Sequence, residues 1–159
     1  MATRSLIAIK NSDNIRYIYC HYDGYLAHNG RILLQSYNTP EIINKLIDGG
    51  SLSILGENIS TDQPHSFNNP VDGVCVYYGR DRKETNVAPR TCVTEEELLA
   101  EGKDRWADYV YLYDGVWKCN HLRFDLVEFT PDDCKWWGLE GGQNALGWVI
   151  GGFDGLGGV

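Results

Sequence analysis

The sequence lacks any apolar run long enough to cross a membrane. A membrane-spanning helix needs about 20 consecutive apolar residues, whereas the N-terminal apolar stretch that begins at Leu6 is closed by Lys10. This stretch is also too short for the core of a secretion signal, and no small-residue cleavage site follows it. We therefore expect no membrane association and a cytoplasmic location.

The cysteines lack the pairing that a disulfide framework or a zinc site requires. There are five, which is an odd number, and none forms a C-x-x-C pair. Structural zinc sites use ligands at close, repeated spacing, and reduced thiols are the rule in a cytoplasm. The sequence therefore predicts free thiols, with neither a metal nor a cofactor. The cysteines are Cys20, Cys75, Cys92, Cys119 and Cys134.

Basic charge is also scarce. The chain has 14 Lys and Arg against 22 Asp and Glu, a net charge of −8, and the acidic excess lies in the C-terminal half. Such a surface repels nucleic acid, so we expect no direct nucleic-acid binding. The acids are scattered rather than arranged in a stripe, which favours ordinary solubility over mimicry of nucleic acid.

The composition is that of one folded domain. The chain has 159 residues, 43% of them hydrophobic and 12% aromatic, which is enough for a core without disulfides and argues against disorder over the whole chain. No internal repeat is visible. The change in character at Cys134 divides the chain into a domain over 1–133 and an extension over 134–159 rich in glycine and tryptophan.

Local patterns predict an α+β fold with a mainly antiparallel sheet, two or three short helices packed on one face, and a Trp/Gly-rich C-terminal tail. Thr39-Pro40 is a helix start, and Asp114-Gly115 joins two apolar runs as a hairpin turn. Residues 51–70 resemble a loop, and 79–84 a charged loop. The predicted strands are 5–10, 15–22, 74–78 (central), 109–113, 116–119 and 121–129; the helices are 29–37, 40–48 and one from Thr94.

The C-terminal tail contains large apolar side chains, unlike a flexible linker. We expect it to dock on its own domain or on another chain, which would allow a homo-oligomer. The predicted partner-binding residues are Trp136, Trp137, Trp148 and Phe153.

One segment gathers the residue types of a catalytic site. His21, Asp23 and His28 are weak candidates for acid–base or metal-assisted hydrolysis. Cys20 and His21 point to opposite sides of a strand, which argues against their sharing a metal. No third group that would orient a nucleophile and a base is evident.

Two segments are better suited to binding an anion. Asn29, Gly30 and Arg31 lie at a predicted helix start, where free N–H groups favour negative charge. The other segment is the most basic of the chain and offers Tyr78 for base stacking, with Arg80 and Arg82 for phosphates. The two segments would converge if their strands were neighbours. The alternative is that these arginines pair with surface acids.

Several short motifs resemble a family of small proteins encoded by bacteriophages, including those of cyanobacteria, and by bacterial mobile elements. The motifs are Met-Ala-Thr-Arg-Ser at 1–5, Tyr-Cys-His-Tyr-Asp-Gly-Tyr at 19–25, His-Asn-Gly at 28–30, Leu-Gly-Glu at 55–57, His-Ser-Phe at 65–67 and Tyr-Gly-Arg-Asp-Arg at 78–82. The resemblance covers roughly residues 1–120, and the tail departs from it. It implies an accessory protein in the host cytoplasm, but no agreed activity and no catalytic residue.

These observations favour a non-enzymatic binding protein. It would sequester a phosphorylated, nucleotide-like ligand, or inhibit a host or defence protein through its acidic C-terminal half. One alternative is a hydrolase or nuclease that uses the His/Asp cluster, and another is a structural component of the virion.

Overall fold

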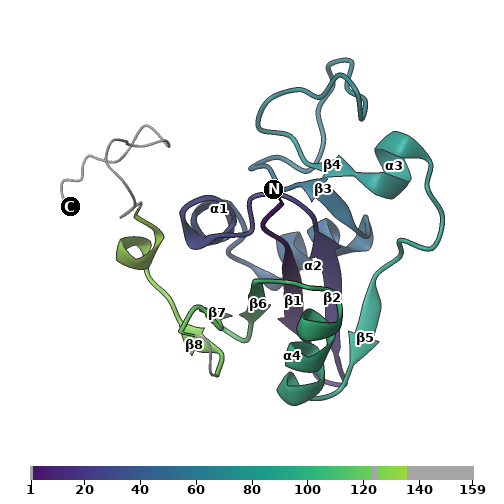
Figure 1. Ribbon diagram of the computed structural model, residues 1–159. Helices are drawn as coiled ribbons and strands as arrows, with labels where there is room; N and C mark the ends of the chain where they lie inside the picture. Colours follow the sequence, from purple (N-terminus) through teal and green to yellow (C-terminus); the bar gives the residue numbers. More distant parts are fainter. Residues whose placement is uncertain (1, 123–124, 136–159) are drawn as a thin grey trace.

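The computed structural model describes residues 2–122 and 125–135. They form an α+β fold around one mixed sheet with the order β4-β3-β2-β1-β6-β7-β8, while β5 pairs with β2 (Figure 1). No described helix is long and apolar enough to cross a membrane. The strands are β1 Ser5–Lys10, β2 Ile15–Cys20, β3 Leu52–Ile54, β4 Val76–Tyr77, β5 Arg90–Cys92, β6 Tyr109–Tyr113, β7 Trp117–Cys119 and β8 Val127–Glu128. The helices are the π-helical turn η1 Leu26–Gly30, α1 Arg31–Ser36, α2 Pro40–Asp48, α3 Tyr78–Arg82, α4 Glu95–Asp104 and the 3₁₀ turn η2 Pro131–Cys134.

The local predictions for the two hairpins are confirmed. β1 and β2 pair antiparallel in register from Ser5↔Cys20 to Lys10↔Ile15. β6 and β7 also pair antiparallel, and Gly115 in their turn has a φ of 78°, which a glycine adopts without strain. Most of the other strand pairs are antiparallel, but β1 pairs parallel with β6 and β2 parallel with β3.

The predicted caps of α2 and α4 are confirmed as well. The Thr39 side chain accepts a hydrogen bond from the Ile42 N–H, and Pro40 takes the first helical position. At α4, Thr94 and Glu97 form a reciprocal capping box. Each of these side chains satisfies backbone donors that a helix start leaves free.

Helices cover both faces of the sheet, so the prediction that they pack on one face is wrong. α1 and α2 cover Ile7 and Ile18, whereas α4 covers Leu6 and Tyr17 on the opposite face; in Figure 1, α4 lies in front of the sheet and α2 behind it. The reason is that β1 is apolar at successive positions, so both of its faces need cover. We call the two sides the α2 side and the α4 side.

Three further expectations are corrected around β3. Residues 51–70, expected to be loop, include the short strand β3, which lies between β2 and β4. The strand predicted over 74–78 is only the two residues of β4, and it lies at the end of the sheet instead of the centre. The expected charged loop begins as the helix α3. Similarly, only Val127–Glu128 of the strand predicted over 121–129 forms a strand.

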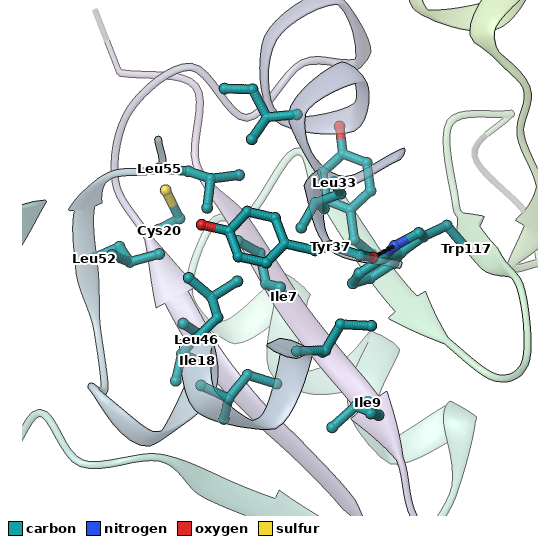
Figure 2. Close-up of a cluster of buried hydrophobic side chains, with 14 of the residues drawn as sticks. Ile7, Ile9, Ile18, Cys20, Leu33, Tyr37, Leu46, Leu52, Leu55 and Trp117 are labelled. Atoms are coloured by element: carbon teal, nitrogen blue, oxygen red, sulfur yellow. Dashed lines mark hydrogen bonds between the residues drawn. The ribbon is translucent and has the colours of Figure 1, made fainter. Parts of the chain in front are cut away.

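In the α2-side core, four buried aromatic side chains donate hydrogen bonds to backbone carbonyls. The hydroxyl groups of Tyr37, Tyr77 and Tyr111 donate to the carbonyls of Gly56, Leu46 and Gly24 at 2.7, 2.6 and 2.6 Å. The Trp117 indole donates to the Tyr37 carbonyl at 2.8 Å (Figure 2). Each large ring therefore fills the core without leaving a buried donor unpaired.

All five cysteines are free thiols, and all of them except Cys92 are buried. Burial raises the pKa of the Cys20 and Cys134 thiols to about 12, and it raises that of the half-buried Cys92 to about 11. Cys134 packs into the α2-side core, so the described fold extends through η2.

Candidate functional site

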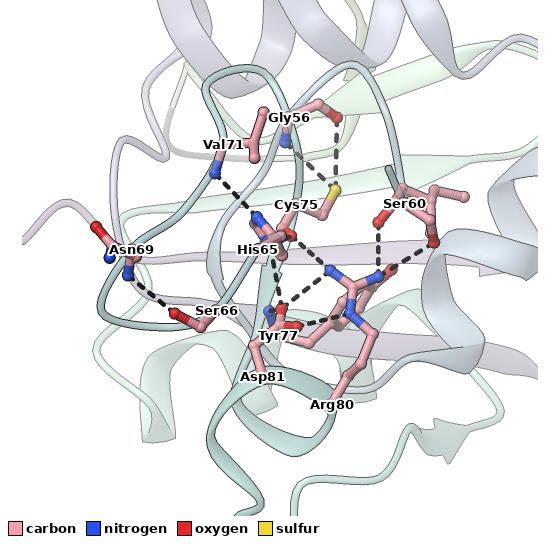
Figure 3. Close-up of polar contacts among 11 residues, drawn as sticks. Gly56, Ser60, His65, Ser66, Asn69, Val71, Cys75, Tyr77, Arg80 and Asp81 are labelled. Carbon is pink, nitrogen blue, oxygen red and sulfur yellow. Dashed lines mark hydrogen bonds and ion pairs between the residues drawn. The ribbon is translucent and has the colours of Figure 1, made fainter. Parts of the chain in front are cut away.

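A polar network fixes α3 to the loop that joins β3 to β4 (Figure 3). The Arg80 guanidinium donates to both Asp81 carboxylate oxygens at 2.9 Å. Its other N–H groups reach the carbonyls of Ile59 and Cys75 at 2.7 Å and the Ser60 hydroxyl at 3.3 Å. These contacts use all five donors of the side chain. We call Arg80, Asp81 and His65 the clamp.

His65 supplies the other half of the clamp. Its Nδ1 accepts from the Val71 N–H at 2.9 Å, and its Nε2 lies 3.1 Å from the Cys75 carbonyl and 3.5 Å from Asp81. Because a carbonyl only accepts, Nε2 is the ring nitrogen that donates, and Nδ1 is the one that accepts. Both nitrogens are occupied, so this histidine is a structural link and not a free base.

The charges of the clamp hold each other in the ionised state. Burial would raise the pKa of the Asp81 carboxyl, but hydrogen bonds from Arg80 and from the Tyr77 N–H lower it below its ordinary value. The hydrogen bond to Asp81 in turn raises the pKa of Arg80. The Asp81 side chain is only 5% exposed, so its charge depends on these partners.

The clamp positions two partly exposed aromatic rings, those of Phe67 and Tyr78, next to Arg82. The Arg82 guanidinium lies 4.4 Å from the ring centre of Phe67 and 5.3 Å from that of Tyr78. The two rings are themselves 5.6 Å apart. Phe67 belongs to the loop that His65 anchors, and Tyr78 begins the helix that holds Arg80. The arginine also pairs with Glu84, and its side chain is 51% exposed.

A second group of rings follows the end of β2. The Tyr19 hydroxyl lies 2.7 Å from His21 Nδ1, and the His21 ring meets the Tyr22 ring edge-on at 4.5 Å. Burial, and then the positive charge of Arg4, lower the pKa of His21 below its ordinary value. His21 is therefore neutral at neutral pH.

Pairing with β3 brings the two groups of rings together. The N–H groups of His21 and Tyr22 donate to the carbonyls of Leu52 and Ser53 at 3.0 and 3.1 Å. The Tyr78 side chain is hydrogen-bonded to Ser53, so it lies beside this continuation of β2. We call the combined region the aromatic–arginine surface. It consists of Arg4, Tyr19, His21, Tyr22, Phe67, Tyr78 and Arg82.

Positive charge surrounds Tyr19. Arg4 and Arg105 both lower the pKa of its hydroxyl electrostatically, although burial raises it overall. Arg90 and Arg105 line a small crevice that also contains Tyr19. Arg105 pairs with Glu101, whereas Arg4 and Arg90 form no ion pair with a carboxylate among the described residues. In an acidic protein, such arginines are the side chains available to an anion.

The segment at Asn29 does not join this surface, so the two predicted anion-binding segments do not converge. The helix begins at Leu26, three residues before the predicted start, which leaves no free N–H cluster at Gly30. The Asn29 amide is buried on the α2 side, where it donates to Ser5 Oγ at 3.2 Å. Arg31 donates to the Ala27 carbonyl and to Gln35. Ligand binding by this segment stays a prediction.

The proposed catalytic cluster is dispersed. His21 contacts Tyr19, Asp23 accepts from the Tyr25 hydroxyl at 3.3 Å, and His28 contacts Asn29 Oδ1 at 2.8 Å. No described contact joins His21, Asp23 and His28 to one another. Within the described ranges, no three His, Cys, Asp or Glu side chains gather as metal ligands would.

Sequence reasoning selected Tyr78 and Arg82 but missed Arg4, Tyr19 and Phe67. Only tertiary pairing of β2 with β3 brings these residues near Tyr78, and no local motif signals it. The tail residues Trp136, Trp137, Trp148 and Phe153 lie outside the described residues. Comparison with protein-family models, curated proteins and solved structures found no match to this chain.

Proposed function

We propose that this protein is a non-enzymatic binding protein that holds a phosphorylated, nucleotide-like ligand on the aromatic–arginine surface. One observation supports this most directly. Half-buried rings lie beside Arg4, an arginine without a described carboxylate partner, in a chain of net charge −8. An arginine that forms no ion pair with any of the described acids is available for an anionic ligand.

The chemistry of the surface suits both parts of such a ligand. The exposed Tyr22 ring offers a face on which a base can stack, and the Tyr78 and Phe67 rings do so on the sides that Arg82 does not cover. Arg4 can donate to phosphate oxygens, as can Arg90, which lies beside the surface in the crevice that Tyr19 lines. His21 gains a proton more readily when an anion lies beside it. The clamp fixes the loop and helix that carry these rings, so little order is lost on binding.

The biological setting follows from the resemblance to phage-encoded accessory proteins. Sequestering a nucleotide-like signal in the host cytoplasm would be a counter-defence activity that needs no catalysis. The dispersal of His21, Asp23 and His28 gives the hydrolase alternative no geometric support. Inhibition of a host protein and a structural role in the virion find no specific support among the described contacts.

Isothermal titration calorimetry with ADP and with a cyclic dinucleotide tests the proposal, with adenosine and inorganic phosphate as partial ligands. We expect one of the nucleotides to bind, and Arg4→Ala and Tyr78→Ala each to weaken it at least about tenfold. Arg16→Ala is the matched control, because Arg16 is paired with Asp48 at 2.7 Å.

Two outcomes would overturn the proposal. One is the absence of binding by every nucleotide tested, and the other is an equal loss of affinity in Arg16→Ala. Chromatography of the titrated sample shows whether the nucleotide is intact. Conversion of the nucleotide would favour the enzyme alternative.

A further inference from the structure

An open cavity of about 460 Å³ lies between α1 and the 3₁₀ turn η2. Its volume falls in the range of small-molecule sites, roughly 300 to 1,000 Å³. η2 contacts both η1 and α1, so the two walls of the cavity are held together by packing. The lining is mostly apolar, and its described residues are Arg31, Leu34, Gln35, Pro131, Cys134 and Lys135.

The apolar part of the lining comes from both walls. Leu34 of α1 is half-buried and packs against the α2-side core, while Pro131 of η2 is exposed. Cys134 is buried and belongs to the same core, so it forms the floor of the cavity. A short aliphatic chain or an aromatic ring placed here would cover Leu34 and Pro131 and remove apolar surface from water.

Arg31 brings a positive charge to this lining. Its Nε donates to the Ala27 carbonyl at 3.2 Å, and its Nη1 donates to Gln35 Oε1 at 3.3 Å. Among the described residues, Nη2 has no hydrogen-bond partner and the guanidinium is in no ion pair. Burial, and then the charge of Asp133, raise the pKa of the Cys134 thiol to about 12, whereas the charge of Arg31 lowers it. The guanidinium therefore lies near the floor of the cavity.

The other cation of the lining already has a partner. Lys135 Nζ lies 3.1 Å from an Asp132 carboxylate oxygen, and the described lining contains no Asp or Glu. The described lining thus has one positive charge without a counter-charge. It complements a ligand with one negative charge better than a phosphate monoester, which carries about −1.5 to −2 at neutral pH.

We propose that this cavity binds a small amphipathic carboxylate, in which one carboxylate group is joined to a compact apolar body. The carboxylate accepts a hydrogen bond from Arg31 Nη2, while Gln35 holds the guanidinium in place through Nη1. The apolar body packs against Leu34 and Pro131.

Other ligand classes fit less well. A sugar would place its hydroxyl groups against an apolar wall, where they would lose hydrogen bonds to water. A neutral apolar molecule would cover the guanidinium without giving Nη2 an acceptor. The inference goes beyond the proposed function and does not rest on it, because the described lining shares no residue with the aromatic–arginine surface.

NMR titration of the full chain tests the inference, with hexanoate and phenylacetate as probes at up to about 20 mM. We expect at least one of them to give saturable shifts of the Arg31 Nε–H and Leu34 methyl signals, and the comparison shows whether the preferred apolar body is aliphatic or aromatic. The matched neutral amides, hexanamide and phenylacetamide, should bind at least about tenfold more weakly, because they lack the charge that pairs with Arg31.

Variants locate the binding on the two walls. Arg31→Ala should weaken carboxylate binding at least about tenfold, and Leu34→Ala, which removes part of the apolar wall, at least about threefold. Arg16→Ala is the matched control and should leave the binding unchanged, because the Arg16 guanidinium is already paired with Asp48.

Absence of saturable shifts at Arg31 and Leu34 with both carboxylates would overturn the inference. The same result is expected if the chain that follows Lys135 fills the cavity. Equal affinity for a carboxylate and its amide would also overturn it, and this comparison needs no variant to fold. Inorganic phosphate is titrated in parallel, and saturable shifts with phosphate alone would assign the cavity to a different anion.

Discussion

The α2-side core and the aromatic–arginine surface both contain several aromatic side chains, but they use them differently. In the core, the hydroxyls of Tyr37, Tyr77 and Tyr111 donate to backbone carbonyls, and the rings are at most 1% exposed. On the surface, Tyr22 is 44% exposed, and an arginine lies over the Tyr78 ring. Residue type alone therefore does not separate structural rings from those available to a ligand.

α3 repeats this contrast between Arg80 and Arg82, which are two positions apart on one short helix. Arg80 directs all five donors into the protein, whereas Arg82 lies over two rings and pairs only with Glu84. The first holds the loop and the second is accessible. Substitutions can separate the two roles, and the effects below are ordered from the largest.

Truncation of a core ring should have the largest effect. We expect Tyr111→Ala to lower the free energy of unfolding by about 3 to 5 kcal/mol, because it leaves a cavity and an unpaired Gly24 carbonyl. Tyr78→Ala, in a half-buried position, should cost about 1 kcal/mol or less. Urea denaturation followed by circular dichroism measures both. If both variants lost the same free energy of unfolding, the surface ring would be as important for stability as the core ring, and the contrast would fail.

The two arginines of α3 should differ by a smaller amount. Arg80→Ala removes the partner of the buried Asp81 carboxylate, and we expect a loss of about 2 to 3 kcal/mol after allowance for the partial exposure of Arg80. Arg82→Ala should stay within about 0.5 kcal/mol of the parent. Thermal unfolding of the pair gives the comparison, and a larger loss in Arg82→Ala would reverse the assignment of roles.

The smallest effect concerns His21. Its pKa is lowered in the folded protein, so the unfolded chain binds the proton more readily. Its contribution to stability is therefore fully present above about pH 6.5 and declines as the pH falls toward the folded pKa. NMR titration should show a pKa below 6.5 that rises in Arg4→Ala and on binding of a phosphorylated ligand. If the pKa of His21 were unchanged in Arg4→Ala, Arg4 would not lie close enough to His21 to belong to this surface.

Features determined by neighbouring residues could be predicted from the sequence. The Asp114-Gly115 turn and the Thr39 and Thr94 caps form as expected, because each depends on contacts within a few residues. Features that depend on distant contacts could not be predicted. β3 is only three residues long, and it pairs with β2 on one side and β4 on the other. Arg80 has its hydrogen-bond partners about 20 residues earlier in the chain, at Ile59 and Ser60.

The same limit applies to the candidate site. Tyr78 and Arg82 could be selected because basic and aromatic residues are adjacent in the sequence. Arg4 and Tyr19 could not, because the sheet register brings them together with residues some 60 positions later along the chain.

The state of the thiols has a practical consequence for experiments on this protein. With pKa values of about 11 for Cys92 and about 12 for Cys20 and Cys134, very little thiolate is present at neutral pH. Thiol-directed reagents react with the thiolate, so the native cysteines should be labelled slowly. A cysteine introduced at the exposed Tyr22 would be modified first, and a fluorophore there would report on the aromatic–arginine surface without removal of any native cysteine.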